Sequence, residues 1–209
     1  MATKKMNTAG SMWNKWDLHI HTPASFHWEG DRFEGKTQEQ KDAICKQVIE
    51  AINGTDVVAF CVMDYWTFEG YKLLRDYNSR HLDATKKLIL PGIELRLDAP
   101  ANYRLNAHVL FSDELPLDTL DAFLTTLRFS GPDERPVTKA NFIAVARNYA
   151  GDKLRLHGFK VEDKVNDAKM LECGMKTAEV SRESLKHAIE TVGKEHCLFI
   201  LPYDTSDGV

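Results

Sequence analysis

The first half of the chain alternates between strand and helix patterns. Residues Asp17 to His21 alternate polar and apolar side chains, which is typical of a strand with two different faces. Gln38 to Ile52 places apolar residues at helical spacing, and Asn53-Gly54 is expected to end that helix. Asp56 to Met63 is a nearly continuous apolar run, as expected of a strand buried on both faces of a parallel sheet.

The pattern continues with one more helix and two more strands. Thr67 is expected to cap a helix from Phe68 to about Tyr77. Strands are predicted over Leu88 to Leu97 and over Leu105 to Phe111. Because the first three strands are separated by helices, we predict an α/β architecture with parallel strands.

The second half has a different character. Ser130 to Pro136 is predicted to be a loop, and the pattern between Leu154 and Lys176 is mixed. A fifth strand is expected at Cys197 to Leu201, so close to Val209 that we expect the sequence to be the N-terminal portion of a longer polypeptide or domain. Helical spacing is found in three segments: Leu117 to Arg128, Lys139 to Tyr149 and Ser181 to Val192.

Composition limits the class of protein. With 209 residues and 43% hydrophobic residues, the chain is long enough for one globular domain with a sizeable core. No apolar run approaches the roughly 18 residues of a membrane span, and no signal peptide is evident. Four scattered cysteines are expected to be reduced thiols in a cytoplasmic protein. The net charge of −4 indicates no cationic surface for nucleic acid, although bound metal ions would add local positive charge.

Two histidines on one strand are the first candidate for chemistry. Residues two apart in a strand share a face, so Asp17, His19 and His21 are expected to point the same way. Two such imidazoles can converge on one metal ion. Ordinary half-buried histidines are the alternative.

Four further residues stand at or inside the other predicted strands. Asp64 directly follows the most hydrophobic strand, where it either forms part of a site or merely begins a turn. Glu94 lies inside an apolar strand and needs a cation, either a metal ion or Arg96 on the same face. His108 lies within the fourth predicted strand, where a lone histidine is more often a satisfied core residue than a ligand.

Taken together, these residues resemble the motifs of the PHP (polymerase and histidinol phosphatase) superfamily. The segment WDLHIHTPAS is similar to its first motif, Asp-x-His-x-His-Thr, and Gly92-Ile93-Glu94 is similar to its Gly-x-Glu. His108 matches a histidine on the following strand, and MDYWTFEGY stands at the second motif. The resemblance covers about residues 13–113, and it is closest to the TrlF-like group, in which a PHP domain precedes an ATPase module.

The resemblance implies a fold. The expected architecture is a distorted (β/α)7 barrel formed by a single domain over residues 1–209, incomplete at the C-terminus. A helical insertion is expected after the fourth strand, at about residues 115–195. Further domains, including an ATPase, would follow in a longer polypeptide.

The resemblance also implies a metal centre. His19 and His21 would hold a first divalent ion, Glu94 would bridge it to a second, and His108 would bind the second. Asp64 would serve as a ligand or catalytic group, and Arg96 would contact a substrate phosphate. Manganese, zinc, magnesium and iron are the expected metals.

The sequence departs from the family pattern in two places. Tyr65 stands where the second motif has a histidine, which removes a ligand for a third ion. Leu201-Pro202-Tyr203 stands where a later His-Pro is expected, and neither Asp204 nor Asp207 can be mapped onto the final motif.

Three functions are compatible with these residues. The first is a metal-dependent phosphoesterase, by resemblance a nuclease or phosphodiesterase that acts on nucleic acid with an ATPase domain or subunit, in nucleic-acid processing or in defence against invading phage DNA. The second is a small-molecule phosphatase. The third is an inactive PHP scaffold or interaction domain, which Tyr65 and Leu201 motivate. An oligomer is compatible with each of them.

Overall fold

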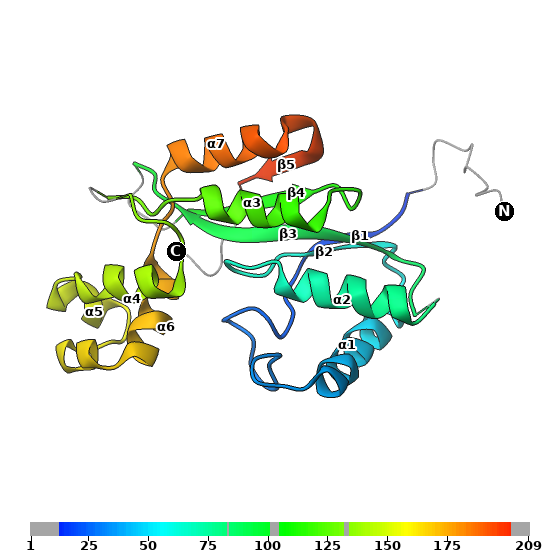
Figure 1. The fold of residues 1–209 in the computed structure, drawn as a ribbon, viewed down its shortest axis with the longest axis horizontal. Coiled ribbons are helices and arrows are strands. Elements are labelled where there is room, and N and C mark those ends of the chain that lie inside the picture. Colours follow the sequence, from blue (N-terminus) through cyan, green and yellow to red (C-terminus); the bar gives the residue numbers. More distant parts are fainter. Residues whose placement is uncertain (1–12, 83, 101–104, 132–133, 202–209) are drawn as a thin grey trace.

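A five-stranded sheet runs through the centre of the computed structural model, which describes residues 13–82, 84–100, 105–131 and 134–201 (Figure 1). The strands are β1 (Trp16–Ile20), β2 (Ala59–Val62), β3 (Leu88–Leu97), β4 (Leu105–Phe111) and β5 (Cys197–Ile200). The helices are α1 (Gln38–Asn53), α2 (Glu69–Arg80), α3 (Leu117–Thr126), α4 (Lys139–Arg147), α5 (Gly151–Leu156), α6 (Asp167–Thr177) and α7 (Arg182–Val192), with short 3₁₀ turns at Val161–Val165 and Lys194–His196. The predicted α/β class is confirmed.

The strands lie in the sheet in their sequence order, from β1 to β5. β1, β2 and β3 are parallel, because α1 and α2 return the chain to the same end of the sheet before each new strand. β4 and β5 are antiparallel to their neighbours, so the predicted parallel arrangement needs correction beyond β3. The connection from β3 to β4 is too short for a helical crossover. Closure into a seven-stranded barrel stays a prediction.

The two faces of the sheet have different surroundings. Ile93, Leu95 and Val109 belong to the main hydrophobic core, to which α1, α2, α3 and α7 contribute their buried side chains. Side chains alternate along a strand, so Glu94 and His108 point to the opposite face. A smaller cluster around Cys61, Met63 and Leu110 lies on that face, with Leu18 and Ile200 packed against it. The candidate chemistry is therefore on the face of the sheet opposite the main core.

Helices α4, α5 and α6 form a separate lobe beside the sheet (Figure 1). They enclose a small core of Ala146, Leu154, Phe159, Met170 and Cys173. α3 and α7 pack on each other and on the main core instead. The chain between β4 and β5 thus contributes both to the body of the molecule and to this lobe.

None of the helices in the described parts of the chain is both long enough and apolar enough to cross a membrane.

Candidate metal centre

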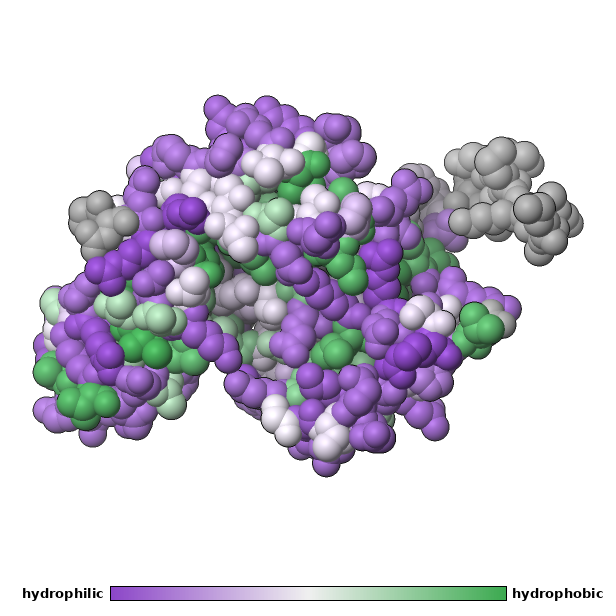
Figure 2. Space-filling model, viewed as in Figure 1, coloured by the Kyte–Doolittle hydropathy of each residue, from purple (hydrophilic) through white to green (hydrophobic). Residues whose placement is uncertain are grey.

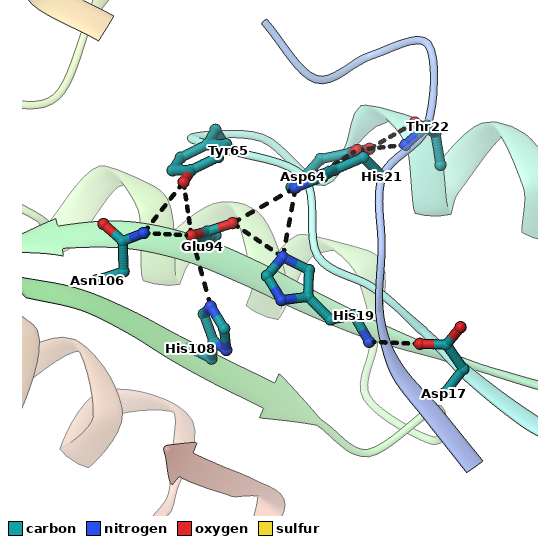
Figure 3. A network of polar contacts seen from close by, with 9 residues as sticks. All are labelled: Asp17, His19, His21, Thr22, Asp64, Tyr65, Glu94, Asn106 and His108. Carbon is teal, nitrogen blue, oxygen red and sulfur yellow. Dashed lines mark hydrogen bonds and ion pairs between the residues drawn. The ribbon is translucent and has the colours of Figure 1, made fainter. Parts of the chain in front are cut away.

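The end of β1 carries the two histidines of the first motif. His19 lies within the strand, and His21 lies just after it. Their Nε2 atoms are 3.3 Å apart, so the two rings converge as their spacing predicts (Figure 3). Asp17 does not join them, because its carboxylate turns aside and accepts a hydrogen bond from the backbone N–H of His19.

Glu94 brings a buried carboxylate to these rings from β3. Its residue exposure is 2%, and its Oε2 lies 3.1 Å from His19 Nε2 and 3.5 Å from His21 Nε2. Burial alone would raise the pKa of Glu94, but contacts with His108, His19 and Tyr65 more than offset it and hold the pKa well below its usual value. The carboxylate is therefore ionised and needs a cation on its open side.

The three atoms fit a metal ion. His19 Nε2, His21 Nε2 and Glu94 Oε2 form a triangle with edges of 3.1, 3.3 and 3.5 Å. Ligands bound tetrahedrally at about 2.0–2.1 Å, as zinc ligands are, lie about 3.3 Å from one another. Burial lowers the pKa of His21 to about 4, so this imidazole is neutral near pH 7, as a ligand has to be.

A second layer of side chains surrounds the other oxygen of Glu94. Tyr65 donates its hydroxyl hydrogen to Oε1 at 2.6 Å, and the Asn106 side-chain amide donates to the same atom at 2.8 Å. His108 Nε2 lies 3.5 Å from Oε1. These three residues and Glu94 converge from β3, β4 and the loop after β2 (Figure 3).

Asp64 lies behind His21 instead of beside the three ligand atoms. Its carboxylate is fully buried, and it accepts hydrogen bonds from the backbone N–H and the hydroxyl of Thr22 at 2.7 and 2.5 Å. Burial raises the pKa of Asp64 to about 7. Its nearest approach to the imidazole is 3.9 Å, from Oδ1 to His21 Nδ1. Asp64 therefore fixes the segment that carries His21.

Arg96 is also buried, with 1% of its surface exposed. Its guanidinium donates a hydrogen bond to the backbone carbonyl of Met175 and lies 4.8 Å from the centre of the Tyr65 ring. This position supports Tyr65 from behind, and a substrate phosphate would not meet the guanidinium there.

Sequence reasoning gave no role to two residues of this candidate centre, Asn106 and Thr22, and treated Tyr65 only as a departure from the family pattern. Asn106 and Thr22 form the hydrogen bonds described above, and Tyr65 is bonded to the buried carboxylate. One signal was available for Asn106, because it shares a strand face with His108. Among the residues compared with the later motifs of the family, Leu201 is exposed. Pro202, Tyr203, Asp204 and Asp207 lie outside the described residues.

The candidate centre opens to solvent through His19, whose side chain is 42% exposed. His19 and His108 line a hollow of about 550 Å³ that extends to Ile200 on β5. An ion held by three protein ligands on this open side would keep free positions for water or substrate, as catalytic sites do.

A larger cleft of about 970 Å³ lies between the loop after β1 and the lobe of α4 and α6, with Tyr65 in its wall. Figure 2 shows the surface hollowed between the lobe and the body of the molecule. Four cationic and four carboxylate side chains line this cleft. Three of each are paired: Lys139 with Glu34, Lys41 with Glu69 and Lys176 with Glu172. The cleft therefore carries no strong positive charge.

No protein-family model matches the sequence, and no curated protein matches it. Among solved structures, the chain is similar to an amidohydrolase from Chromobacterium violaceum with bound sulfate and no metal, with a TM-score of 0.41 and 14% identity over 86% of this chain. It is also similar to a predicted metal-dependent phosphoesterase from Bifidobacterium adolescentis, with a TM-score of 0.39 and 14% identity over 87% of this chain. The chain spans 51% of each of those proteins. TM-scores this low do not define a common fold, so the chemistry of this chain rests on its own residues.

Proposed function

We propose that this chain is a divalent-metal-dependent phosphoesterase. The observation that carries the proposal is the triangle of His19 Nε2, His21 Nε2 and Glu94 Oε2, open to solvent on the His19 side. Bound there, a divalent ion would supply Lewis acidity, polarising a phosphoryl oxygen and activating water. The resemblance of the motifs to the PHP superfamily selects phosphate esters among the substrates of such sites.

The residues of the chain have distinct tasks in this proposal. His19, His21 and Glu94 would hold the ion. Tyr65 and Asn106 orient Glu94 through hydrogen bonds. Asp64 and Arg96 are buried behind this layer, and we assign them supporting roles in place of the direct catalytic ones implied by the resemblance.

A nucleic-acid substrate, a coupled ATPase module and a role in phage defence are finer proposals that the resemblance alone supports. The balanced charge of the cleft beside Tyr65 gives a polyanion little attraction. A nuclease would therefore need cationic surface from a further domain or subunit. Hydrolysis of small phosphate esters would need less cationic surface than the described residues would have to provide for a nucleic acid.

The first experiment measures metal content and hydrolysis on the same preparations. Wild-type protein purified without chelators is analysed by mass spectrometry for manganese, zinc, iron and magnesium. It is then assayed with bis-p-nitrophenyl phosphate, p-nitrophenyl phosphate, DNA and RNA. We expect bound metal and hydrolysis of at least one ester in the wild type.

The matched variants remove histidines at two places. His19→Ala/His21→Ala is expected to lose both metal and hydrolysis, whereas His187→Ala, on the exposed surface of α7, is expected to keep both. Metal that stays bound to the double variant would refute the assignment of the ligands. Metal bound to the wild type without hydrolysis of any ester would refute the phosphoesterase and favour a scaffold.

A further inference from the structure

The carboxylate of Glu94 has one oxygen available for a metal ion, and its other oxygen already accepts hydrogen bonds from neighbouring side chains. Oε2 faces His19 and His21, at 3.1 and 3.5 Å. Oε1 accepts two short hydrogen bonds, from the Tyr65 hydroxyl at 2.6 Å and from the Asn106 amide at 2.8 Å. A carboxylate oxygen has two in-plane lone pairs, and these two donors take both.

We infer that this centre binds one divalent ion, not two, because Tyr65 and Asn106 close the second oxygen of Glu94 to a bridging ion. The inference rests on the metal centre of the proposed function. The family resemblance implies a second ion between Glu94 and His108. His108 Nε2 lies 3.5 Å from Oε1, but a second ion there would have to displace a hydrogen bond. Tyr65 is then a positioning residue that keeps Glu94 monodentate.

Tyr65 is held in this position by the backbone around it. The next residue, Trp66, has a φ of 63°, a left-handed conformation that is rare for a bulky side chain. It is fixed there by a hydrogen bond from Trp66 Nε1 to the Met175 carbonyl at 2.9 Å and by packing against Phe142. Such a conformation persists only where the surroundings determine it, and it tends to occur at functional sites.

The same loop is aligned with Glu94 itself. The backbone N–H of Glu94 donates to the Asp64 carbonyl at 3.2 Å, and Tyr65 forms a parallel bridge with Glu94. The Tyr65 ring stacks on His21, at 5.5 Å between centroids, and the Arg96 guanidinium lies over the ring. The hydroxyl is therefore aimed at Oε1 before any ion binds, and rotation away from it would disrupt several contacts.

The test counts ions and measures affinity in the full chain, with Mn²⁺ as the probe. Isothermal titration calorimetry gives the affinity, and together with mass spectrometry it gives the number of Mn²⁺ equivalents bound per chain. Electron paramagnetic resonance distinguishes an isolated Mn²⁺ from an exchange-coupled pair. We expect one equivalent and an isolated-ion spectrum for wild type. His108→Ala is expected to bind one equivalent as well.

Tyr65→Phe separates positioning from packing, because it removes only the hydroxyl. We expect one equivalent with an affinity about 10- to 100-fold lower, the usual loss when a hydrogen bond that orients a metal ligand is removed. Circular dichroism and a thermal melt check that the variant folds. An affinity equal to that of wild type in a folded variant would overturn the positioning role.

The outcomes also separate this inference from the proposed function. Two equivalents with a coupled spectrum, reduced to one by His108→Ala, would overturn the single-ion centre while leaving the phosphoesterase intact. One equivalent without hydrolysis of any phosphate ester would support the single-ion centre and refute the phosphoesterase. Absence of bound Mn²⁺ in wild type would overturn both.

Discussion

At the scale of single residues, the absence of a side chain at Gly70 leaves space for the buried Asp64 carboxylate. A Cβ at this position would lie 2.0 Å from Thr22 Oγ1 and 2.2 Å from Asp64 Oδ2. Because neither group can withdraw without losing a buried hydrogen bond, Gly70→Ala should lower the free energy of unfolding by about 1–3 kcal/mol. Urea denaturation followed by circular dichroism measures the loss.

Gly54 provides the control for that substitution. It ends α1 with a φ of −70°, and an added Cβ would meet its nearest atoms at 3.5 Å. Gly54→Ala should therefore be neutral or slightly stabilising. Equal urea midpoints for the two variants would show that Thr22 and Asp64 rearrange without cost.

The same scale shows what the sequence can and cannot predict about a site. The spacing of His19 and His21 predicts convergence, and the burial of Glu94 in an apolar strand predicts a cationic partner. The first expectation follows from strand geometry, and the second follows from the free-energy cost of burying an unpaired carboxylate. The contacts of Asn106 and Thr22 depend on which residues of neighbouring elements come opposite one another. That register is a tertiary property, so the strand face that Asn106 shares with His108 could suggest a place near the site, but the hydrogen bonds themselves could not be derived from the sequence.

At the scale of elements, long periodic segments were predicted well and their ends less so. The helix predicted from Phe68 begins at Glu69 and continues to Arg80, although the Thr67 hydroxyl does accept a hydrogen bond from the Glu69 N–H. The mixed segment from Leu154 to Lys176 contains the second half of α5 and nearly all of α6, with a 3₁₀ turn between them. Short helices show few periods, and their ends are fixed by capping and packing more than by periodicity.

An ion pair between α1 and α2 makes the stability of these elements depend on pH. Arg80 donates two hydrogen bonds of 2.7 Å to the Asp42 carboxylate, which lowers the pKa of Asp42 from 3.8 to about 2. A lowered pKa in the folded state adds stability above the unfolded value, and this is lost as the pH falls from about 4 to about 2. Wild type should therefore have a higher urea midpoint than Asp42→Asn at neutral pH, and the difference should vanish near pH 2.

Glu50→Gln is the matched control on α1. Its partner Lys46 lies 3.8 Å away and both side chains are well exposed, so this pair should contribute nothing measurable. A difference between wild type and Asp42→Asn that stays constant from neutral pH to about pH 2 would show that the carboxylate acts through packing and not through its charge.

At the scale of the whole molecule, the described residues form a main hydrophobic core, a smaller core in the lobe, and a third small cluster on the opposite face of the sheet. The lobe of α4, α5 and α6 encloses five buried residues of its own, although Phe142 of α4 belongs to the main core and Leu171 and Met175 of α6 pack against that core. The lobe and the body of the molecule are also linked where Trp66 and Arg96 donate hydrogen bonds to the Met175 carbonyl on α6. Among the described residues, the three candidate ligands come from β1, the residue after it and β3, so the candidate centre belongs to the larger unit.

This division predicts that the lobe can open locally while the sheet stays folded. Leu154 is fully buried at the centre of the lobe, and Leu154→Ala should cost about 2–5 kcal/mol of local stability. Native-state hydrogen exchange should show faster exchange for amides of α5 and α6 and unchanged exchange for β3. Leu120→Ala, at a fully buried position of the larger core, should instead accelerate exchange in both units, because the lobe has no support once the sheet unfolds. Equal acceleration of β3 and α5 by Leu154→Ala would mean that the molecule unfolds as one cooperative unit.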